Sequence, residues 1–531
     1  VSSKSQSYMS RRRMMLGKKP LLQCVMAFLL RTATALLPAN TWHLSTRCEE
    51  GDINAIFQYR GVWHLMHQTE LRPHASIGHQ VSTDLLHWTH VSDALQAGDG
   101  PDQQCYDGSA SLVLHNGTLK PLLMIDGGCG LKGAGTEPCM ESSGSDTGGV
   151  IAVPGDLNDP HLTNWTKQGP TVFKGCDGSS GPSPMWKNGD KYNLVAIHGF
   201  GTARFESTDA MLGSWKMADP AFIPQRGGGG GLWHKVPPTV DGLKEQAWPT
   251  HIFQCNRFGD GRPTFALGIY DHQHETFSNM TDPLPVDIGV GVVFGQLSSE
   301  TPEDSDGADR RVLHASWLSE LKGPQSSDCR NTGVITSFRE LRFDPRIDRL
   351  VENPIFEYLR LRKDILFQTT VSLQAAKGPE IIYAGVGGLS MDTEFSIAIP
   401  SSFKSGNITI GVRCGNLSCT DGARISLGIS EPDAALSQRQ ISMQVLTPEQ
   451  TPRTSFPLLA GEITLPMRIM SDHRTVEVFA GSGRGVFSGS MYSTDVQVMA
   501  SCDTGDFQVA ATGWALASVV GKASTSKTLH V

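Results

Sequence analysis

The chain has 531 residues, with 45 Lys and Arg against 53 Asp and Glu, so its formal net charge is −8. Charges of both signs are dispersed along it, which argues against a nucleic-acid partner, because nucleic-acid-binding surfaces are basic. The length exceeds what a single hydrophobic core usually supports, and we expect two domains.

The N-terminal segment has the order of a secretory signal. Basic residues between Arg11 and Lys19 precede an apolar run over residues 21–30, and small residues follow through Ala35. This order is typical of a signal peptide, and the apolar run is too short to span a bilayer. We expect residues 1–35 to be the signal-peptide region. The mature protein is then secreted or vacuolar, with no membrane partner after cleavage.

The cysteines and glycosylation sequons favour the same compartment. Removing the signal also removes Cys24 and leaves ten of the eleven cysteines, an even number that favours disulfides in a secreted chain. Cys414 with Cys419 is the easiest pair to predict, and Cys129 with Cys139 is next. No cysteine spacing resembles a zinc site, and we expect no metal. Asn-X-Ser/Thr sequons occur at Asn116, Asn164, Asn279, Asn407 and Asn416.

The body of the chain predicts many short strands. Val, Thr, Phe and Trp recur in short runs between Gly, Asp, Asn and Pro, and helical periodicity is nearly absent. An acidic turn residue precedes a Trp in residues 84–88, 159–165 and 209–215, at intervals of about one four-stranded blade. Such repetition predicts a β-propeller. Ordinary hairpins in a sandwich are the alternative.

Residues 51–66 are the most informative stretch. Asp52 and Asn54 stand just ahead of a predicted β-hairpin whose second strand is aromatic-rich and closes on Gln68. A carboxylate at a strand end is held in a fixed direction, so Asp52 is a candidate nucleophile. The alternative is that Asp52 only begins a turn before a strand.

This stretch resembles the start of the catalytic domain of glycoside hydrolase family 32, which comprises invertases, inulinases and fructan enzymes. The family signature is Asn-Asp-Pro-Asn-Gly, followed by a hairpin that ends in Tyr-His-Leu-Phe-Tyr-Gln. The residues that match without a gap are Asp52, Asn54, Gly61, His64, Leu65 and Gln68. The family's first Asn, its Pro and its second Gly are replaced by Gly51, Ile53 and Ala55.

The resemblance covers almost the whole mature chain. Tyr106-Asp-Gly-Ser is similar to the family's Phe-Ser-Gly-Ser, and further matches lie at residues 77–85, 268–271, 287–291, 311–317 and 467–479. It implies an all-β fold, with a five-bladed β-propeller followed by a C-terminal β-sandwich. We place the propeller at residues 36–358, the linker at 359–366 and the sandwich at 367–531.

The resemblance also implies a function. Family 32 enzymes cleave terminal β-fructosyl bonds of sucrose or fructans with retention, using two carboxylates. Asp52 fills the nucleophile position. The positions implied to contact the sugar are Asn54, Gln68, Tyr106, Asp107 and Ser180. No cofactor is implied, and the oligomeric state is not predicted.

Two functional positions depart from the family pattern. The family's Arg-Asp-Pro is replaced by Ser180-Gly181-Pro182, so the carboxylate that holds two fructosyl hydroxyls is absent. The acid/base position of Trp-Glu-Cys-Pro-Asp is occupied by His234. An imidazole can donate a proton at mildly acidic pH; alternatively, His234 is inert. Asp107, Asp177 and Glu245 are candidates to replace this acid, because loops could bring them to the site.

Three functions remain open on this sequence. We expect a secreted β-fructofuranosidase-type glycosidase with an altered acid/base side. The alternative is a catalytically impaired or inactive relative that binds fructosides. A third possibility, a five-bladed glycosidase acting on arabinose or xylose polymers, is disfavoured by the sandwich motif at residues 472–479.

Overall fold

The computed structural model describes most of the chain from Thr41 to Val519. The described residues are 41–44, 50–69, 76–96, 107–126, 148–174, 179–198, 201–211, 215–223, 232–240, 243, 247–256, 262–299, 311–319, 333–385, 389–400, 403–431, 438–491 and 493–519. Among them, no helix is both long enough and apolar enough to cross a lipid bilayer.

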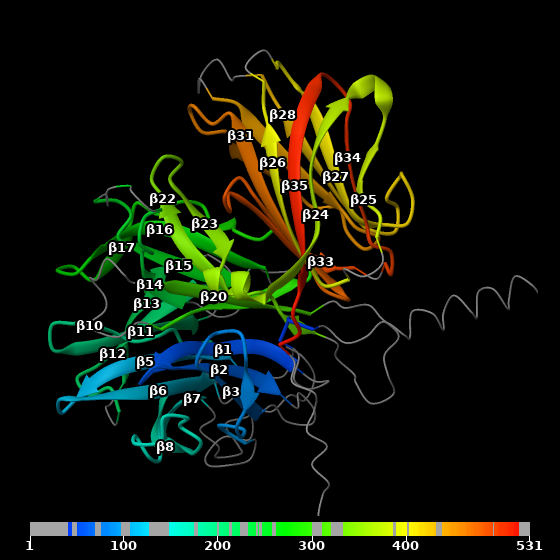
Figure 1. Ribbon diagram of the computed structural model, residues 1–531. Helices are drawn as coiled ribbons and strands as arrows, with labels where there is room; N and C mark the ends of the chain where they lie inside the picture. The colour runs from blue at the N-terminus through cyan, green and yellow to red at the C-terminus, as the bar shows by residue number, and fades with distance from the viewer. Residues whose placement is uncertain are drawn as a thin grey trace, which may run out of the picture.

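Five small antiparallel sheets follow one another along the chain (Figure 1). The first contains β1 (Glu50–Tyr59), β2 (Val62–Thr69), β3 (Ser76–Ser82) and β4 (Thr89–His90). The second contains β5 (Gly108–His115), β6 (Thr118–Asp126), β7 (Gly148–Pro154) and β8 (Trp165–Lys174). The third contains β9 (Ser179–Ser180), β10 (Trp186–Asn188), β11 (Lys191–His198), β12 (Gly201–Ser207) and β13 (Lys216–Ile223).

The remaining two of these sheets have the same sequential order. The fourth contains β14 (Leu232–Lys235), β15 (His251–Asn256), β16 (Pro263–Asp271), β17 (Thr276–Ser278) and β18 (Leu284–Pro285). The fifth contains β19 (Val292–Leu297), β20 (Val312–Leu318), β21 (Val334–Ile335), β22 (Arg339–Asp344) and β23 (Arg349–Pro354). A strand order that follows the chain within each sheet is that of propeller blades.

Hydrophobic packing closes the five blades into a ring. Phe57 of the first blade packs in one cluster with Leu123 of the second, and Leu122 on the opposite face of β6 packs with Leu194 of the third. Equivalent clusters join blades three and four and blades four and five. A fifth cluster joins Leu313 of the last blade to Ile56 of the first. The predicted five-bladed propeller is confirmed.

The weak repeat in the sequence marks one position in three successive blades. Asp84, Asp159 and Asp209 each accept hydrogen bonds from backbone N–H groups two to four residues ahead, at 2.8–3.0 Å. Each turn then enters the last strand of its blade, β4, β8 or β13. An Asp side chain that satisfies these donors fixes the turn without help from a neighbouring strand. The repeat in the sequence therefore marks a turn that an Asp side chain stabilises before the last strand of each of these three blades.

The predicted hairpin at the start of the propeller is formed by β1 and β2. Tyr59 pairs with Val62, and the two residues between them, Arg60 and Gly61, have φ values of 50° and 79°. Positive φ at both central positions defines a type I′ turn, whose twist matches that of the flanking strands. Gly61 adopts this conformation without the steric cost that a Cβ would add.

Two six-stranded sheets form the C-terminal sandwich, which lies above the propeller in Figure 1. The first sheet, in spatial order, contains β24 (Arg362–Gln374), β35 (Asp506–Leu516), β26 (Met391–Ala398), β31 (Thr464–Ser471), β32 (Thr475–Ala480) and β33 (Gly485–Ser490). The second contains β25 (Glu380–Tyr383), β34 (Gln497–Cys502), β27 (Gly406–Cys414), β28 (Ala423–Ile429), β29 (Gln440–Leu446) and β30 (Arg453–Pro457).

Alternating burial along the sandwich strands builds its core. In β28 the buried residues Ile425, Leu427 and Ile429 alternate with half-buried ones, as expected for a strand that covers the core with one face. Short 3₁₀ helices, η5 (Phe356–Leu361) and η6 (Ala375–Lys377), flank β24. The proposed linker at residues 359–366 falls on the end of η5 and the start of β24.

The disulfide prediction is confirmed in one place. Cys414 and Cys419 are bonded, with their Cα atoms 4.5 Å apart. Cys502 is a buried free thiol, and the Sγ atom of the buried Cys255 lies 3.2 Å from Thr264 Oγ1. Cys129 and Cys139 lie outside the described residues.

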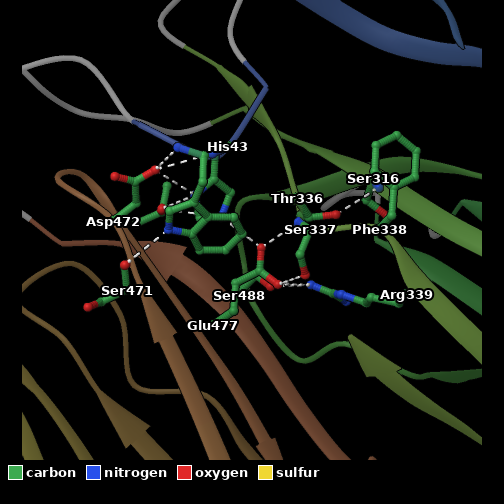
Figure 2. A network of polar contacts seen from close by, with 12 residues as sticks. His43, Ser316, Thr336, Ser337, Phe338, Arg339, Ser471, Asp472, Glu477 and Ser488 are labelled. Atoms are coloured by element: carbon green, nitrogen blue, oxygen red, sulfur yellow. Dashed lines mark hydrogen bonds and ion pairs between the residues drawn. The ribbon is translucent and has the colours of Figure 1, made fainter. Parts of the chain in front are cut away.

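A buried ionic network joins the propeller to the sandwich (Figure 2). Arg339 of β22 is fully buried, and its Nη1 lies 2.8 Å from Asp287 and 3.1 Å from Glu352. Its Nη2 lies 3.2 Å from Glu477 of the sandwich strand β32. One guanidinium therefore neutralises carboxylates from both parts of the molecule.

The segment at residues 41–44 adds a second connection to the same network. The backbone N–H groups of Thr41 and Trp42 donate to Asp472 at 2.8–2.9 Å. The His43 ring contacts Asp472 at 3.3 Å and Glu477 at 2.9 Å. The sandwich motif recognised in the sequence thus binds the segment that leads into the first blade.

The charges in this network oppose the effect of burial on ionisation. Burial alone would raise the pKa of Glu477, but the charge of Arg339 and a hydrogen bond with His43 lower it to about 2. A carboxylate with a depressed pKa stabilises the folded state above its unfolded pKa, and this stability is lost as the pH falls. Burial would lower the pKa of His43, but hydrogen bonds with Asp472 and Glu477 raise it above 6.5. The contribution of His43 is lost as the pH rises through that raised pKa.

Replacing Arg339 with Met should strongly destabilise the protein. The change leaves Asp287, Glu352 and Glu477 buried without their shared cation, and breaking a buried ion pair in this way costs about 3–5 kcal/mol. Urea unfolding measures the loss. Arg349→Met on the same hairpin is the control, because this side chain is exposed and donates to the backbone oxygen of Ser455 at 3.2 Å, and such surface changes usually alter stability by no more than about 0.5 kcal/mol. Equal losses in the two variants would contradict the role given to Arg339.

Candidate active site

The first strands of neighbouring blades meet in the propeller. β1, β5, β14 and β19 each begin the strand order of their sheet. β1 contacts both β5 and β19, and Ile56 of β1 forms a parallel bridge with Ser298, directly after β19. Residues at the start of β1 and just before β5 therefore come together at one end of these strands.

Asp52 is placed by an irregularity in the first strand. The pairing of β1 with β2 shifts register on both sides of Ile53, and Asp52 and Asn54 flank that residue. Such bulges redirect side chains and are common beside active sites. Asp52 is 8% exposed and Asn54 is fully buried. The turn-only alternative for Asp52 is therefore wrong, because the residue lies within β1 and is buried.

The Asp52 carboxyl group meets a second carboxyl group, that of Asp107. The two side chains lie within hydrogen-bonding reach of each other, and a hydrogen bond between them requires a proton on one of the two, because a carboxylate can only accept. Gln68 Nε2 donates to Asp107 Oδ1 at 3.1 Å. Asp52 Oδ1 has no hydrogen-bond partner among the described residues. Three positions singled out in the sequence, Asp52, Gln68 and Asp107, are thus contiguous.

Burial raises the pKa of both groups, and the negative charge of Asp107 adds to the rise at Asp52. The pKa of Asp52 lies well above its usual 3.8 because of burial, the negative charge of Asp107 and the hydrogen bond between them. Burial also raises the pKa of Asp107, although its hydrogen bonds with Gln68 and Asp52 oppose that rise. Two carboxyl groups in one buried site bind a proton more tightly than either would alone.

The histidines of the family-like hairpin have a structural role. His64 Nδ1 lies 2.9 Å from His79 Nε2, and the His64 ring stacks on Phe57 with centroids 4.7 Å apart. Burial lowers the pKa of His64 to about 3, so the ring is neutral at ordinary pH. The matches at His64 and His79 therefore identify a packed blade core.

Gly181 follows the short strand β9 and has a φ of 59°. Ser180 of β9 pairs with Ile197 of β11, which fixes the backbone next to this glycine. The left-handed conformation is open to Gly and, among other residues, most readily to Asn and Asp. The backbone here is compatible with the Asp that the family has, but the carboxylate is missing.

His234 lies on β14, where it is 5% exposed. Its neighbour Trp233 packs against Tyr270 and stacks on His251, with ring centroids 5.3 and 5.0 Å away. Successive side chains of a strand point to opposite faces, so the ring of His234 projects away from this aromatic cluster. Packing of Trp233 thereby fixes the direction of His234.

Several predicted site residues lie outside the described residues, namely Tyr106, Asp177 and Glu245. Within the described part of the chain, no group of three or more His, Cys, Asp or Glu side chains is arranged to hold a metal ion. A hollow of about 690 Å³ lies between the β22–β23 hairpin and the sandwich. None of the predicted site residues lines it, and its arginines Arg342, Arg346 and Arg484 are paired with acids.

Comparison with known proteins gives the family. Residues 49–354 match the model of the glycosyl hydrolases family 32 N-terminal domain, which is more than half of the chain. The protein therefore belongs to glycosyl hydrolase family 32, a family of enzymes that hydrolyse O-glycosyl bonds.

Individual relatives agree with this assignment. The chain is 24% identical to acid beta-fructofuranosidase of Vigna radiata and 25% identical to beta-fructofuranosidase 1 of Zea mays, in each case over 87% of this chain and 75% of the relative. The fold is similar to that of fructan 1-exohydrolase IIa from Cichorium intybus, with a TM-score of 0.73, 17% identity and coverage of 90% of this chain and 97% of that one. Exo-inulinase from Aspergillus awamori matches with a TM-score of 0.67 and 17% identity over 90% and 98%.

The contact between Asp52 and Asp107 was not anticipated from the sequence. Asp107 was expected to touch the sugar or to replace the missing acid, and the structure places it beside the residue at the nucleophile position. The signal was present, because Asp107 stands where the family's Phe-Ser-Gly-Ser block has Ser. That difference places a second carboxyl group in a site that in the family has a hydroxyl at this point.

Proposed function

We propose that the protein is a β-fructofuranosidase-type hydrolase that cleaves terminal β-fructosyl bonds of sucrose or fructans with retention of configuration. Asp52 is the nucleophile in this proposal. The observation that carries it is the position of Asp52, which is buried and aimed by a bulge at the start of the first strand of the propeller. The match of the surrounding hairpin to the family signature supports the same role.

The proposed reaction has two steps. The Asp52 carboxylate attacks the anomeric carbon of the fructosyl unit, the bond to the leaving oxygen breaks, and that oxygen takes up a proton. Water then releases the sugar from the ester. In retaining enzymes the proton donor lies on the leaving-group side, about 5–5.5 Å from the nucleophile. Asn54 and Gln68, at the same end of the first blade, are proposed to contact the sugar.

The printed names of the relatives support this substrate class. They include acid beta-fructofuranosidases of several plants and a fructan 6-exohydrolase of Beta vulgaris. The Cichorium intybus fructan 1-exohydrolase is also known in complex with 1-kestose. A short fructan or sucrose is therefore the first substrate to test.

The acid side of the site supports a second candidate function, a fructoside-binding protein with little or no turnover. Gly181 carries no side chain to hold the fructosyl hydroxyls. His234 replaces the carboxylic acid, and an imidazolium next to a cationic transition state is electrostatically unfavourable. Loss of a general acid typically costs about 10²–10⁴-fold in rate.

We further propose that the protein enters the secretory pathway and is secreted or vacuolar. The signal-like order of residues 1–35, the sequons and the Cys414–Cys419 disulfide support this. Two relatives from a Rosa hybrid cultivar carry the word vacuolar in their names.

Replacing Asp52 with Asn should remove hydrolysis of sucrose, inulin and levan, by at least about 10⁴-fold if the chain is catalytic, because it removes the attacking charge. Binding of the same sugars, measured by calorimetry, should persist because volume and polarity are kept. Asp348→Asn makes the same chemical change on an exposed turn and should leave activity unchanged. Full activity in the Asp52 variant would exclude it as the nucleophile.

Restoring both missing carboxylates should accelerate the reaction. His234→Glu with Gly181→Asp places a proton donor opposite Asp52 and an acid beneath the fructosyl hydroxyls, so hydrolysis should rise by at least about 10²-fold. His234→Glu alone should give less, because the two groups stabilise one transition state. The left-handed backbone at residue 181 costs an Asp about 1–2 kcal/mol of stability.

The matched control for this experiment is His234→Gln with Gly181→Asn, which keeps the shapes and the backbone cost but supplies no acid. A rise in rate with the acids only is the expected result. If the acid variant binds fructosides yet stays inert, the binding-protein candidate is favoured. If the unmodified protein is already fast and His234→Ala is harmless, another acid, such as Glu245, protonates the leaving group.

A further inference from the structure

The proposed reaction uses one carboxyl group, that of Asp52, on the side from which the sugar is attacked. The Asp52–Asp107 pair supplies two. The side chains are held by different elements, since Asp52 lies in β1 and Asp107 immediately precedes β5. The contact between these strands holds the carboxyl groups together at one end of the ring. Asp107 is therefore fixed beside the nucleophile by the fold.

This position excludes Asp107 as the general acid of the proposed mechanism. A retaining nucleophile and its acid lie on opposite sides of the scissile bond and are about 5–5.5 Å apart. Asp107 is within hydrogen-bond reach of Asp52, so it lies on the side of attack. A proton on Asp107 cannot reach an oxygen that leaves from the opposite side.

The hydrogen bonds decide which member of the pair carries the proton. Gln68 Nε2 donates to Asp107 at 3.1 Å, and such a donor favours the ionised form of the acceptor. Asp52 Oδ1 receives no donor from the described residues. Among the same residues, no cationic side chain forms an ion pair with either carboxyl group. The negative charge of the singly ionised pair consequently resides on Asp107 and the proton on Asp52.

Within the described residues, the neighbouring elements supply no positive charge that would offset this arrangement. On β2, His64 and His67 are engaged with His79 and Gln80 of β3, at 2.9 and 3.1 Å. On β20, His314 pairs with Glu352. Lys120 of β6 contacts Met211 at 3.8 Å. The described strand β19 contains no titratable side chain.

We propose that Asp107 is a positioning residue that keeps one proton on Asp52, so that the nucleophile becomes charged only when the pair releases that proton to solvent. The predicted effect on rate rests on the proposed function, whereas the shared proton does not depend on it. Attack begins after the second ionisation. Hydrolysis therefore requires a higher pH than an ordinary Asp nucleophile would impose.

Asp107→Asn and Asp107→Ser test the effect on rate. Asn keeps the volume without the charge, and Ser is the residue that the family has at this position. In both variants the acidic limb of the kcat/KM profile for sucrose should move down by at least about one pH unit, because the like charge is gone. A purely structural role would lower activity at every pH without moving the limb. An unmoved limb would overturn the proposal.

Thermal unfolding between pH 4 and 7 tests the shared proton without catalysis. A carboxyl group whose pKa is raised on folding stabilises the folded state at low pH, and this contribution is lost as the pH rises above the unfolded value of about 3.8. The unfolding temperature of Asp107→Asn should therefore rise relative to that of the unmodified protein as the pH increases. Asp52→Asn should give the same trend, and the exposed Asp348→Asn control should give none.

The two measurements separate this inference from the proposed function. Suppose that the unfolding temperatures of Asp107→Asn and Asp52→Asn both rise with pH relative to the unmodified protein, but that neither the unmodified protein nor the variants hydrolyse sucrose. That result would support the shared proton and contradict the catalytic function. Parallel unfolding curves for Asp107→Asn and Asp348→Asn would show that the pair binds no extra proton. That result would overturn the inference even if Asp52 proved to be the nucleophile.

Discussion

Packing of each propeller blade on the next is the constraint on which the candidate site depends. Each hydrophobic cluster joins one blade to the next, and the last cluster joins Leu313 to Ile56. Because the ring is closed, β1 lies beside both β5 and β19, and residues distant in sequence meet at the ends of these strands. The Asp52–Asp107 contact results from the packing of the first blade on the second, which share the cluster of Phe57 and Leu123.

The sandwich is attached to this ring by charge as well as by apolar packing. Arg339 binds carboxylates of the propeller and of the sandwich together. His43 connects residues 41–44 to Asp472 and Glu477 (Figure 2). A network of this kind is costly to bury, so it stabilises only while every charge keeps its partner. The segment leading into β1, the strand that holds Asp52, is thereby fixed on the sandwich. The sandwich supports the position of the first blade without contributing a predicted catalytic residue.

Local chemistry made the turns and strands of the fold predictable from the sequence. Contacts between separate elements made the candidate site harder to predict. The type I′ turn at Arg60-Gly61, the Asp-capped turns before Trp88, Trp165 and Trp215, and the short-loop disulfide all depend on neighbouring residues, and the sequence pattern identified each of these segments. The two departures at Gly181 and His234 were also visible once the family resemblance was recognised. The pairing of Asp52 with Asp107 arises from packing between two blades, and the partners of His43 arise from contact with the sandwich. No local pattern encodes such contacts, and only the Ser-to-Asp difference at residue 107 hinted at the first.

The central claim is that Asp52 attacks the fructosyl carbon. Quenching the protein with acid during sucrose turnover, followed by proteolysis and mass spectrometry, tests this claim most directly, because a retaining mechanism passes through a covalent ester. The account predicts a fructosyl adduct on the peptide that contains Asp52, fragmenting to that residue. An adduct on Asp107 or on another carboxyl group, or no adduct in a protein that turns sucrose over, would contradict it.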